Sequence, residues 1–404
     1  MKKTLLTLTI CTFLTACGGS SDSSNSQPNQ PGNPSVPGNP GSKTGILTDS
    51  PIEGATYSIN GVTAKTNAKG EFKYNEGDII SFKVGDIEVG AVKGAARITP
   101  VDLTNDEVKQ LNLLILLQSL DDDGDHDNGI KLPEAVSSLA ADAVNLSQPT
   151  AQFVSTLETE LKTIPALANN TVVTAEKAKE NFKATLLKDI TGIWYVGASN
   201  SEESELALII EEDGSYIMGE AIPSEPNNEG NGVEVGKISV DPLTGDFTVT
   251  VDVDTNDDWG LHDPAVTRIM NMTYNGVTLR LQEAADSSEG ATFNRVPNTT
   301  SGLVGVWKIN SGPQTFFFNS NNTYFMLDPS DADDCGKPGI EYGHYKVQDN
   351  KLFTTKIVVD TNGCAGLSNN YSHLGIPMSI QANTLTISVT DEGNYSFNRL
   401  NVAK

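Results

Sequence analysis

The oxygen-bearing side chains between residues 123 and 134 have the spacing of a cation-binding loop. Aspartates alternate at Asp123, Asp125 and Asp127, Gly129 offers a backbone carbonyl, and Glu134 stands at the twelfth position of the loop. Calcium takes about six to eight oxygen ligands, which alternating carboxylates and a closing bidentate glutamate can supply. The sequence therefore predicts a calcium site formed by Asp123, Asp125, Asp127, Gly129 and Glu134.

This loop resembles the calcium loop of EF-hand and dockerin proteins, with Asn128 where that family has glycine. Asparagine visits the left-handed conformation more readily than most residues, so we expect Asn128 to make the sharp turn. The resemblance implies a helix on each side, and the sequence predicts helices over 105–120 and 135–144. Asp121 and Asp122 add negative charge that a metal would relieve. The alternative is an acidic turn between helices that holds no metal.

The N-terminus indicates export. Two lysines precede an apolar run over residues 5–14, and Leu14-Thr15-Ala16 then precedes Cys17. This pattern resembles the lipobox of bacterial lipoproteins, which implies cleavage before Cys17 and its lipidation by acyl chains such as palmitate. Gly18 follows in place of aspartate, which by the sorting rules of such lipoproteins implies a lipid anchor in the outer membrane, on either the cell-surface or the periplasmic face. The alternative is an ordinary secretory signal with an incidental cysteine.

Charge and cysteine content limit the partners and the compartment. The chain has 52 acidic and 27 basic residues in 404, which argues against a nucleic-acid partner because phosphate binding needs a basic face. Cys335 and Cys364 are left as a pair once the signal and lipidated cysteines are set aside, and we expect them to form a disulfide in an oxidising compartment. A zinc site that adds His344 or His373 is the alternative.

The last half of the chain is an internal repeat. Both copies close with Phe-Asn-Arg, at 293–295 and 397–399. Three further pairs of segments match: Gly192-Ile193-Trp194 with Gly305-Val306-Trp307, 232–236 with 339–343, and 253–261 with 359–367. Apolar and polar residues alternate within each copy, which predicts half-buried strands. Two copies of one β-domain are therefore expected.

An early Gly-x-Trp, a meander of strands and a late arginine resemble lipocalin-like barrels. The resemblance implies that Trp194 packs with Arg295 and Trp307 with Arg399 at the floor of each barrel. A closed barrel also hides the strand edges.

The whole chain is expected to be a mainly β multidomain protein: a β-sandwich plus two tandem lipocalin-like β-barrels, with a helical segment between them. The sandwich resembles the carboxypeptidase-regulatory, transthyretin-like family through its strand and turn segments 45–47, 49–55 and 66–72. Further helices are predicted over 150–161 and 175–187. The expected units are a signal peptide (1–16), a lipidated disordered tether (17–43), the β-sandwich (44–101), the helical calcium segment (102–190) and the barrels (191–297 and 302–404).

Two further groups of polar residues invite a chemical role. Asp254, Asn256 and Asp258 alternate as in a second cation loop, although a turn capped by side chains is the favoured interpretation. Glu234 and Glu341 occupy equivalent places and suggest a catalytic pair, but a residue repeated once per domain is more simply structural. The sequence has no nucleophile elbow, phosphate loop or dinucleotide fingerprint, so we do not expect an enzyme.

The function expected from the sequence is a surface-anchored, calcium-stabilised binding or adhesion protein. Its partners would be the membrane, through the lipid anchor, and a protein, a polysaccharide or a small apolar ligand. Trp259, with Asp254 and Asn256, is the expected contact point. The alternatives are a carrier of a small apolar ligand in the barrels, an envelope hydrolase and an architectural spacer; an apolar cavity would favour the carrier.

Overall fold

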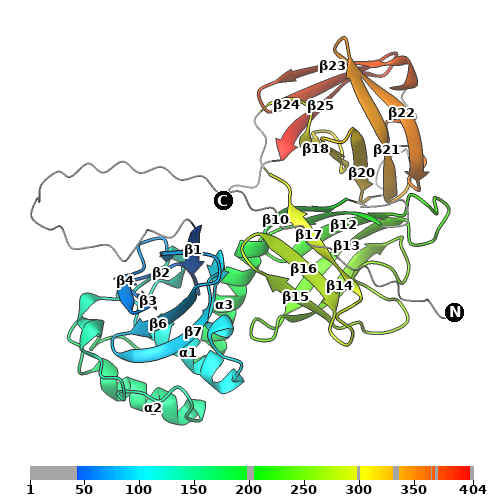
Figure 1. The fold of residues 1–404 in the computed structure, drawn as a ribbon. Coiled ribbons are helices and arrows are strands. Elements are labelled where there is room, and N and C mark those ends of the chain that lie inside the picture. The colour runs from blue at the N-terminus through cyan, green and yellow to red at the C-terminus, as the bar shows by residue number, and fades with distance from the viewer. Residues whose placement is uncertain are drawn as a thin grey trace, which may run out of the picture.

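The computed structural model describes residues 43–197, 204–297, 301–330, 336–364, 366–368 and 372–400. The predicted signal peptide, Cys17, all of the tether but Lys43, and Cys335 lie outside these ranges. The expected fold class is confirmed: the protein is mainly β, with two closed barrels of eight antiparallel strands and a smaller helical portion. Figure 1 shows an N-terminal body beside the first barrel, with the second barrel packed against the first.

The N-terminal body contains two small sheets. One has the strand order β5-β1-β8 and the other β4-β3-β6-β7, and the short strands β2 and β9 pair with each other. The strands are β1 (Lys43–Leu47), β2 (Ile52–Glu53), β3 (Thr56–Ile59), β4 (Val62–Lys65), β5 (Glu71–Tyr74), β6 (Ile79–Val84), β7 (Ile87–Lys93), β8 (Arg97–Ile98) and β9 (Ile130–Lys131). The apolar side chains that alternate along them face one core.

Helices complete that core. The predicted helices at 105–120, 150–161 and 175–187 are confirmed as α1 (Glu107–Ser119), α2 (Thr150–Leu161) and α3 (Ala175–Ile190). Short 3-10 helices cover Pro100–Leu103, His126–Asn128 and Glu134–Ser138. Helix α1 is buried on most sides because its run of leucines and isoleucine is apolar all round. The sandwich and the helical segment, separated in the sequence analysis, share one hydrophobic core.

The helix predicted over 135–144 is wrong. A 3-10 helix at Glu134–Ser138 replaces it, and the chain then continues without regular structure. Ser137 and Ser138 donate their hydroxyls to the carbonyls of Glu134 and Ala135. Such local bonds compete with a continuous α-helix. The helix–loop–helix order of an EF-hand is therefore not formed.

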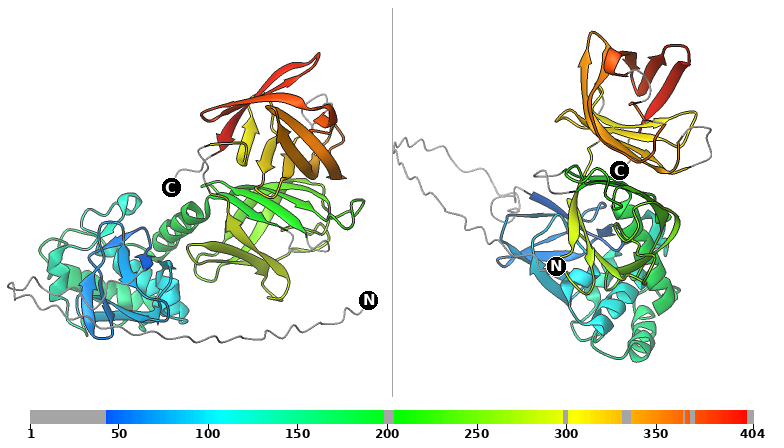
Figure 2. Two further views of the ribbon diagram at one scale, coloured as in Figure 1. Left: turned by 45° about the horizontal axis from the view of Figure 1, so that its top comes forward. Right: turned by 90° about the vertical axis from the view of Figure 1, so that its right-hand side faces the viewer.

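Helix α3 joins the N-terminal body to the first barrel, as Figure 2 shows. Its first half buries Ala178 and Phe182 in the N-terminal core, while Leu186, Leu187 and Ile190 are buried in the core of the first barrel. The same helix therefore serves two cores. Among the described residues, no helix has both the length and the apolar character needed to cross a membrane.

Each repeat forms one barrel in which every strand pairs with its neighbour in the sequence and the last strand closes on the first. The first barrel contains β10 (Gly192–Val196), β11 (Glu205–Ile210), β12 (Ser215–Ala221), β13 (Gly232–Val240), β14 (Asp246–Asp254), β15 (Met270–Tyr274), β16 (Thr278–Glu283) and β17 (Gly290–Arg295). The second contains β18 (Gly305–Ile309), β19 (Thr315–Phe318), β20 (Thr323–Asp328), β21 (Gly339–Gln348), β22 (Lys351–Asp360), β23 (Ile376–Gln381), β24 (Thr384–Val389) and β25 (Gly393–Leu400). Closure leaves no free sheet edge.

The floor of each barrel has the predicted tryptophan–arginine pair. The Arg295 guanidinium carbon lies 4.1 Å from the centre of the Trp194 ring, and Arg399 lies 4.0 Å from that of Trp307. The indole of Trp194 also donates to the Ile190 carbonyl of α3 at 2.8 Å. The floor of the first barrel is thus closed by α3, which leaves the opposite end for any opening.

The two barrels pack through equivalent faces. Buried apolar side chains that point outward from both barrels form a common cluster: Ile193, Ala207, Ile209, Ala221, Val233, Val306, Phe317, Phe325, Leu327, Ile340, Tyr342 and Val359. Glu205 is buried at the edge of this cluster and accepts from the hydroxyls of Tyr195 and Tyr342. Equivalent faces in contact make the pair resemble a two-fold dimer within one chain.

We expect Gly219→Val to destabilise the pair of barrels. A side chain at Gly219 of β12 would collide with Leu327 and Phe325 of the second barrel. Such overpacking costs about 1–3 kcal/mol, so the midpoint of thermal unfolding should fall by several degrees. Thr250→Val, on an exposed position of β14, is the control and should leave it unchanged. Equal midpoints for both variants would show that the barrels do not pack in this way.

Candidate functional site

The first barrel has an open cavity at the end opposite its tryptophan floor. Its volume is about 550 Å³. Most of the inward-facing side chains that line it are apolar: Val196, Leu206, Met218, Leu261, Met270, Leu281 and Phe293. The cavity also contains charged groups, of which Glu220 is buried and Arg268 is half-buried. A pocket of this size and lining suits a small ligand with an apolar body.

The second barrel has a smaller cavity at the equivalent end, of about 270 Å³. Strand pairing places Tyr395 opposite Ile387 in the second barrel and Ala291 opposite Leu281 in the first. Both Tyr395 and Ala291 line their cavities. The larger side chain therefore fills space in the second barrel that stays open in the first.

A fully buried glutamate holds the loop at the mouth of the first barrel. Glu234 accepts from the backbone amides of Leu261 and His262, both at 3.1 Å, and from the hydroxyl of Tyr216. Burial raises the pKa of Glu234, and these hydrogen bonds oppose the rise. Because Leu261 and its neighbour Trp259 line the cavity, this contact positions part of the cavity wall.

The second barrel repeats this arrangement. Glu341 accepts from the amide of Leu367 at 2.7 Å, from that of Ser368 and from the hydroxyl of Tyr324. Each glutamate is completely buried within its own barrel. The geometry therefore favours the structural interpretation of Glu234 and Glu341 over the catalytic pair.

The loop that carries the predicted contact residues is a capped turn. Asp254 accepts from the amide of Asn256 at 3.3 Å and lies 2.7 Å from Nδ1 of His262. Trp259 is 41% exposed at the rim of the cavity, whereas Asn256 is fully buried beneath the loop. The structure thus places Trp259 at the candidate site, whereas Asp254 and Asn256 lie in the capped turn of the loop that carries it.

Glu220 is a cavity residue that was not among the residues predicted from the sequence. Its carboxyl is 6% exposed and lines the cavity. Burial raises the pKa of Glu220 to about 7, with a hydrogen bond from Ser204 opposing the rise and the charge of Glu234 adding to it. The alternation Tyr216-x-Met218-x-Glu220 places all three side chains on one face of β12, which was the available signal.

The predicted calcium loop is closed by its own hydrogen bonds. Asp123 accepts from the amide of Asp125 at 2.9 Å and from the Asn128 side chain at 3.0 Å, and Asp125 accepts from the amide of Asp127. The positive φ lies at Gly124 and Gly129, so the expectation for Asn128 is wrong. Asn128 instead uses its amide to bind Asp123, which leaves the turn to a neighbouring glycine.

A different acidic group stands at the start of that loop. Among the described residues, the one group of three or more potential metal ligands of the His, Cys, Asp and Glu types is Asp121, Asp122 and Asp123, whose ligand atoms lie within 4.8 Å of one another. Asp121 is 1% exposed; its Oδ1 accepts from the Lys131 amide at 2.8 Å, while its buried Oδ2 has no partner. The structure does not gather Asp127 and Glu134 with them.

Ile130 fixes the place of this loop on the body. It is buried and pairs with Ile52 of β2, so the loop is joined to the sandwich portion by a short parallel ladder.

Cys364 is disulfide-bonded, and its predicted partner Cys335 lies outside the described residues. This bond favours the disulfide over the zinc alternative with His344 or His373.

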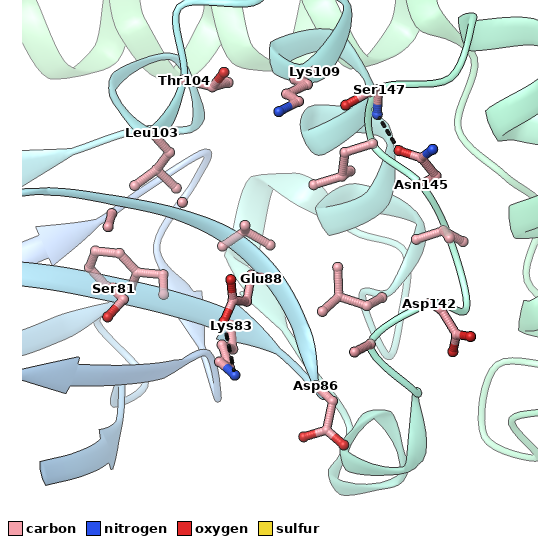
Figure 3. A pocket seen from close by; sticks show the side chains of 18 residues that line it. Ser81, Lys83, Asp86, Glu88, Leu103, Thr104, Lys109, Asp142, Asn145 and Ser147 are labelled. Carbon is pink, nitrogen blue, oxygen red and sulfur yellow. Dashed lines mark hydrogen bonds and ion pairs between the residues drawn. The ribbon is translucent and has the colours of Figure 1, made fainter. Parts of the chain in front are cut away.

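A third hollow, of about 870 Å³, lies between the β6–β7 hairpin and the segment 141–147. Figure 3 shows its polar side chains spread around the wall, with Lys83 and Glu88 paired at 3.3 Å. These groups do not converge on one point, so the hollow offers less definite chemistry than the barrel cavity.

No protein-family model matches the chain, and no curated protein matches it.

We expect Glu234→Ala to lower the free energy of unfolding by about 3 kcal/mol or more. The Tyr216 hydroxyl and two loop amides would lose their acceptor, and each buried unpaired group costs about 1–3 kcal/mol. Denaturant unfolding measures the change, and Glu212→Ala, on the exposed turn before β12, is the control. Equal stabilities of the two variants would contradict the proposed role of Glu234.

Glu220 should make stability depend on pH. Because its pKa of about 7 in the folded state exceeds the ordinary value of 4.5, the folded state holds a proton that the unfolded state releases. Its contribution to stability is complete below pH 4.5 and is lost as the pH rises to about 7. Relative to Glu220→Gln, the free energy of unfolding of the wild type should fall by roughly 3 kcal/mol between pH 4.5 and 8. Parallel pH profiles for the two proteins would contradict this prediction.

Proposed function

We propose that the protein is a binding protein whose first barrel holds a small ligand with an apolar body. The open cavity of about 550 Å³ carries this proposal, because a well-packed interior leaves few voids larger than a water molecule. The apolar wall supplies affinity through burial, and a few polar groups can orient the ligand. The cavity therefore favours a carrier of a small ligand over adhesion through the loops alone.

A hydrolase and an architectural spacer receive less support. The repeated pair Glu234 and Glu341 does not support a hydrolase, because each carboxylate is occupied by a tyrosine and loop amides. A pure spacer would have no need of an open cavity. Trp259 at the rim remains the best placed residue for contact with a ligand or partner.

Ala291→Tyr should reduce ligand binding to the first barrel. This change copies Tyr395 of the second barrel and fills the cavity with an aromatic ring. The binding of a neutral apolar fluorescent probe such as N-phenyl-1-naphthylamine should weaken about tenfold or more, since the ring occupies the space that the probe would enter. Fluorescence titration measures the dissociation constant.

Asn294→Tyr is the matched control. Asn294 lies on the same strand, three residues along, but is exposed on the outer surface. The control should bind the probe as the wild type does. Equal binding by the wild type and Ala291→Tyr would contradict the assignment of the cavity, as would the absence of any binding.

A second candidate role is calcium binding, for which we propose ligands that differ from those predicted by the loop spacing. The unpartnered, buried Oδ2 of Asp121 supports it, together with the nearby carboxylates of Asp122 and Asp123. A buried carboxylate oxygen without a partner is costly, and a divalent cation would satisfy it. The ion would stabilise the junction of α1 and β9, as the sequence analysis expected of calcium, through a different set of oxygens.

Calcium should raise the thermal midpoint of the wild type, and Asp121→Asn should abolish the rise. Binding at a hundred times the dissociation constant adds about 2.7 kcal/mol of stability. Asp127→Asn, an exposed member of the predicted ligand set, is the control and should keep the response. Loss of the response in Asp127→Asn and not in Asp121→Asn would restore the EF-hand-like ligand set, and no response at all would reject calcium.

We also propose that this binding takes place at the outer membrane, with the chain anchored through lipidated Cys17. The Leu-Thr-Ala-Cys pattern supports the anchor. A lipid-anchored carrier would keep its cavity close to the membrane surface, where apolar ligands concentrate.

A further inference from the structure

A buried carboxyl group lies at equivalent positions in the two barrels, but its hydrogen-bond partners differ. Asp328 of β20 is fully buried in the second barrel, where its Oδ2 accepts from Gln314 at 3.0 Å and from Asn362 at 2.9 Å. Neutral amide donors thus satisfy this carboxylate. The second barrel needs no external group at this position.

Glu220 is the equivalent residue of the first barrel, since it pairs with Gly232 as Asp328 pairs with Gly339. Leu206 faces it across the ladder, at the place that Gln314 holds in the second barrel. In the described part of the chain, its one hydrogen bond comes from Ser204. Glu220 therefore faces the cavity with capacity for another donor.

Asn256 extends this difference. Its counterpart Asn362 donates to Asp328, whereas both side-chain polar atoms of Asn256 are buried without a partner. Asn256 of the first barrel therefore does not donate to Glu220, although the equivalent Asn362 donates to Asp328 in the second barrel. Glu220, which lines the cavity, therefore lacks the amide donor that Asp328 has, and a ligand in the cavity can supply a donor in its place.

The charge around the cavity has one dominant sign. Asp258, Glu283 and Glu289 line it together with Glu220, and Arg268 is the one basic residue of the lining. Arg268 already lies 3.4 Å from Glu283 and donates to the carbonyls of Asp258 and Gly260. An anionic ligand would meet repulsion, whereas a cation would be attracted.

We infer that the first barrel selects an organic cation, namely an ammonium group attached to an apolar chain or ring, with Glu220 as the counter-ion. The inference rests on the proposed function and adds the ligand class. The ammonium would donate to Glu220, which lies among apolar side chains where an ion pair is weakly screened. The apolar part would lie along Met218, Met270 and Phe293, and Trp259 at the rim offers an aromatic face for a cation near the mouth.

Three probes with one chain length test this inference. We would titrate the full chain carrying Cys17→Ser, which removes the predicted acylation, with octylammonium, octanol and octanoate by calorimetry at pH 8, above the pKa of about 7 of Glu220. The order of affinity should be octylammonium, then octanol, then octanoate, with about tenfold between the first two. Glu220→Gln should weaken octylammonium about tenfold and leave octanol unchanged.

Two further variants separate charge from shape. Glu220→Asp keeps the carboxylate, as in the second barrel, and should retain the preference for octylammonium. Glu289→Gln removes one exposed charge at the rim and should change the preference less than Glu220→Gln does. Circular dichroism checks that each variant is folded.

The outcomes distinguish this inference from the proposal it rests on. If octanol binds and octylammonium binds no more tightly, or if Glu220→Gln keeps the preference, the ligand class is wrong and the cavity remains a binding site. If none of the three probes binds, the proposed function fails and the inference fails with it.

Discussion

A buried carboxylate must have its hydrogen bonds satisfied, and this requirement shapes both barrels. Glu234 and Glu341 sit inside the barrels, where they accept from a tyrosine on the neighbouring strand and from amides of the loop after the fifth strand. Each glutamate therefore holds that loop down against the barrel. In the first barrel the held loop carries Trp259 and Leu261 to the cavity, so the opening depends on a contact deep in the interior.

The two barrels share one framework and differ in the residues that line their open ends. Both copies have the tryptophan–arginine floor and the glutamate contact, and they pack through the same outward faces. The differences are at Ala291 and Tyr395, which set the cavity volume, and at Leu206 and Gln314, which decide whether the buried acid is satisfied. The duplication thus allows the first barrel to bind a ligand while the second barrel stabilises the pair.

Much of the fold could be predicted because its signals are local or repeated. Alternating strands, the two copies and three helices follow from spacing, since each depends on period or register. The floor pairs were implied by the resemblance to lipocalin-like barrels. The helix expected over 135–144 failed because serine hydroxyls satisfy the local carbonyls instead. Two of the predicted calcium ligands, Asp123 and Asp125, accept from amides of the loop itself, and the buried Asp121 accepts from the Lys131 amide of β9. The alternation along β12 places Glu220 on the same face as Tyr216 and Met218, but the closed barrel is needed to show that this face lines a cavity.

The methionine methyl groups provide the most direct test of the central claim, that the first barrel has the ligand-binding cavity. Met218 and Met270 line that cavity, whereas Met326 and Met378 belong to the core of the second barrel. Methyl-labelled protein titrated with an apolar ligand should show chemical-shift changes at Met218 and Met270 that saturate together, with Met326 and Met378 unmoved. Changes confined to the second barrel, or none in either, would contradict the assignment.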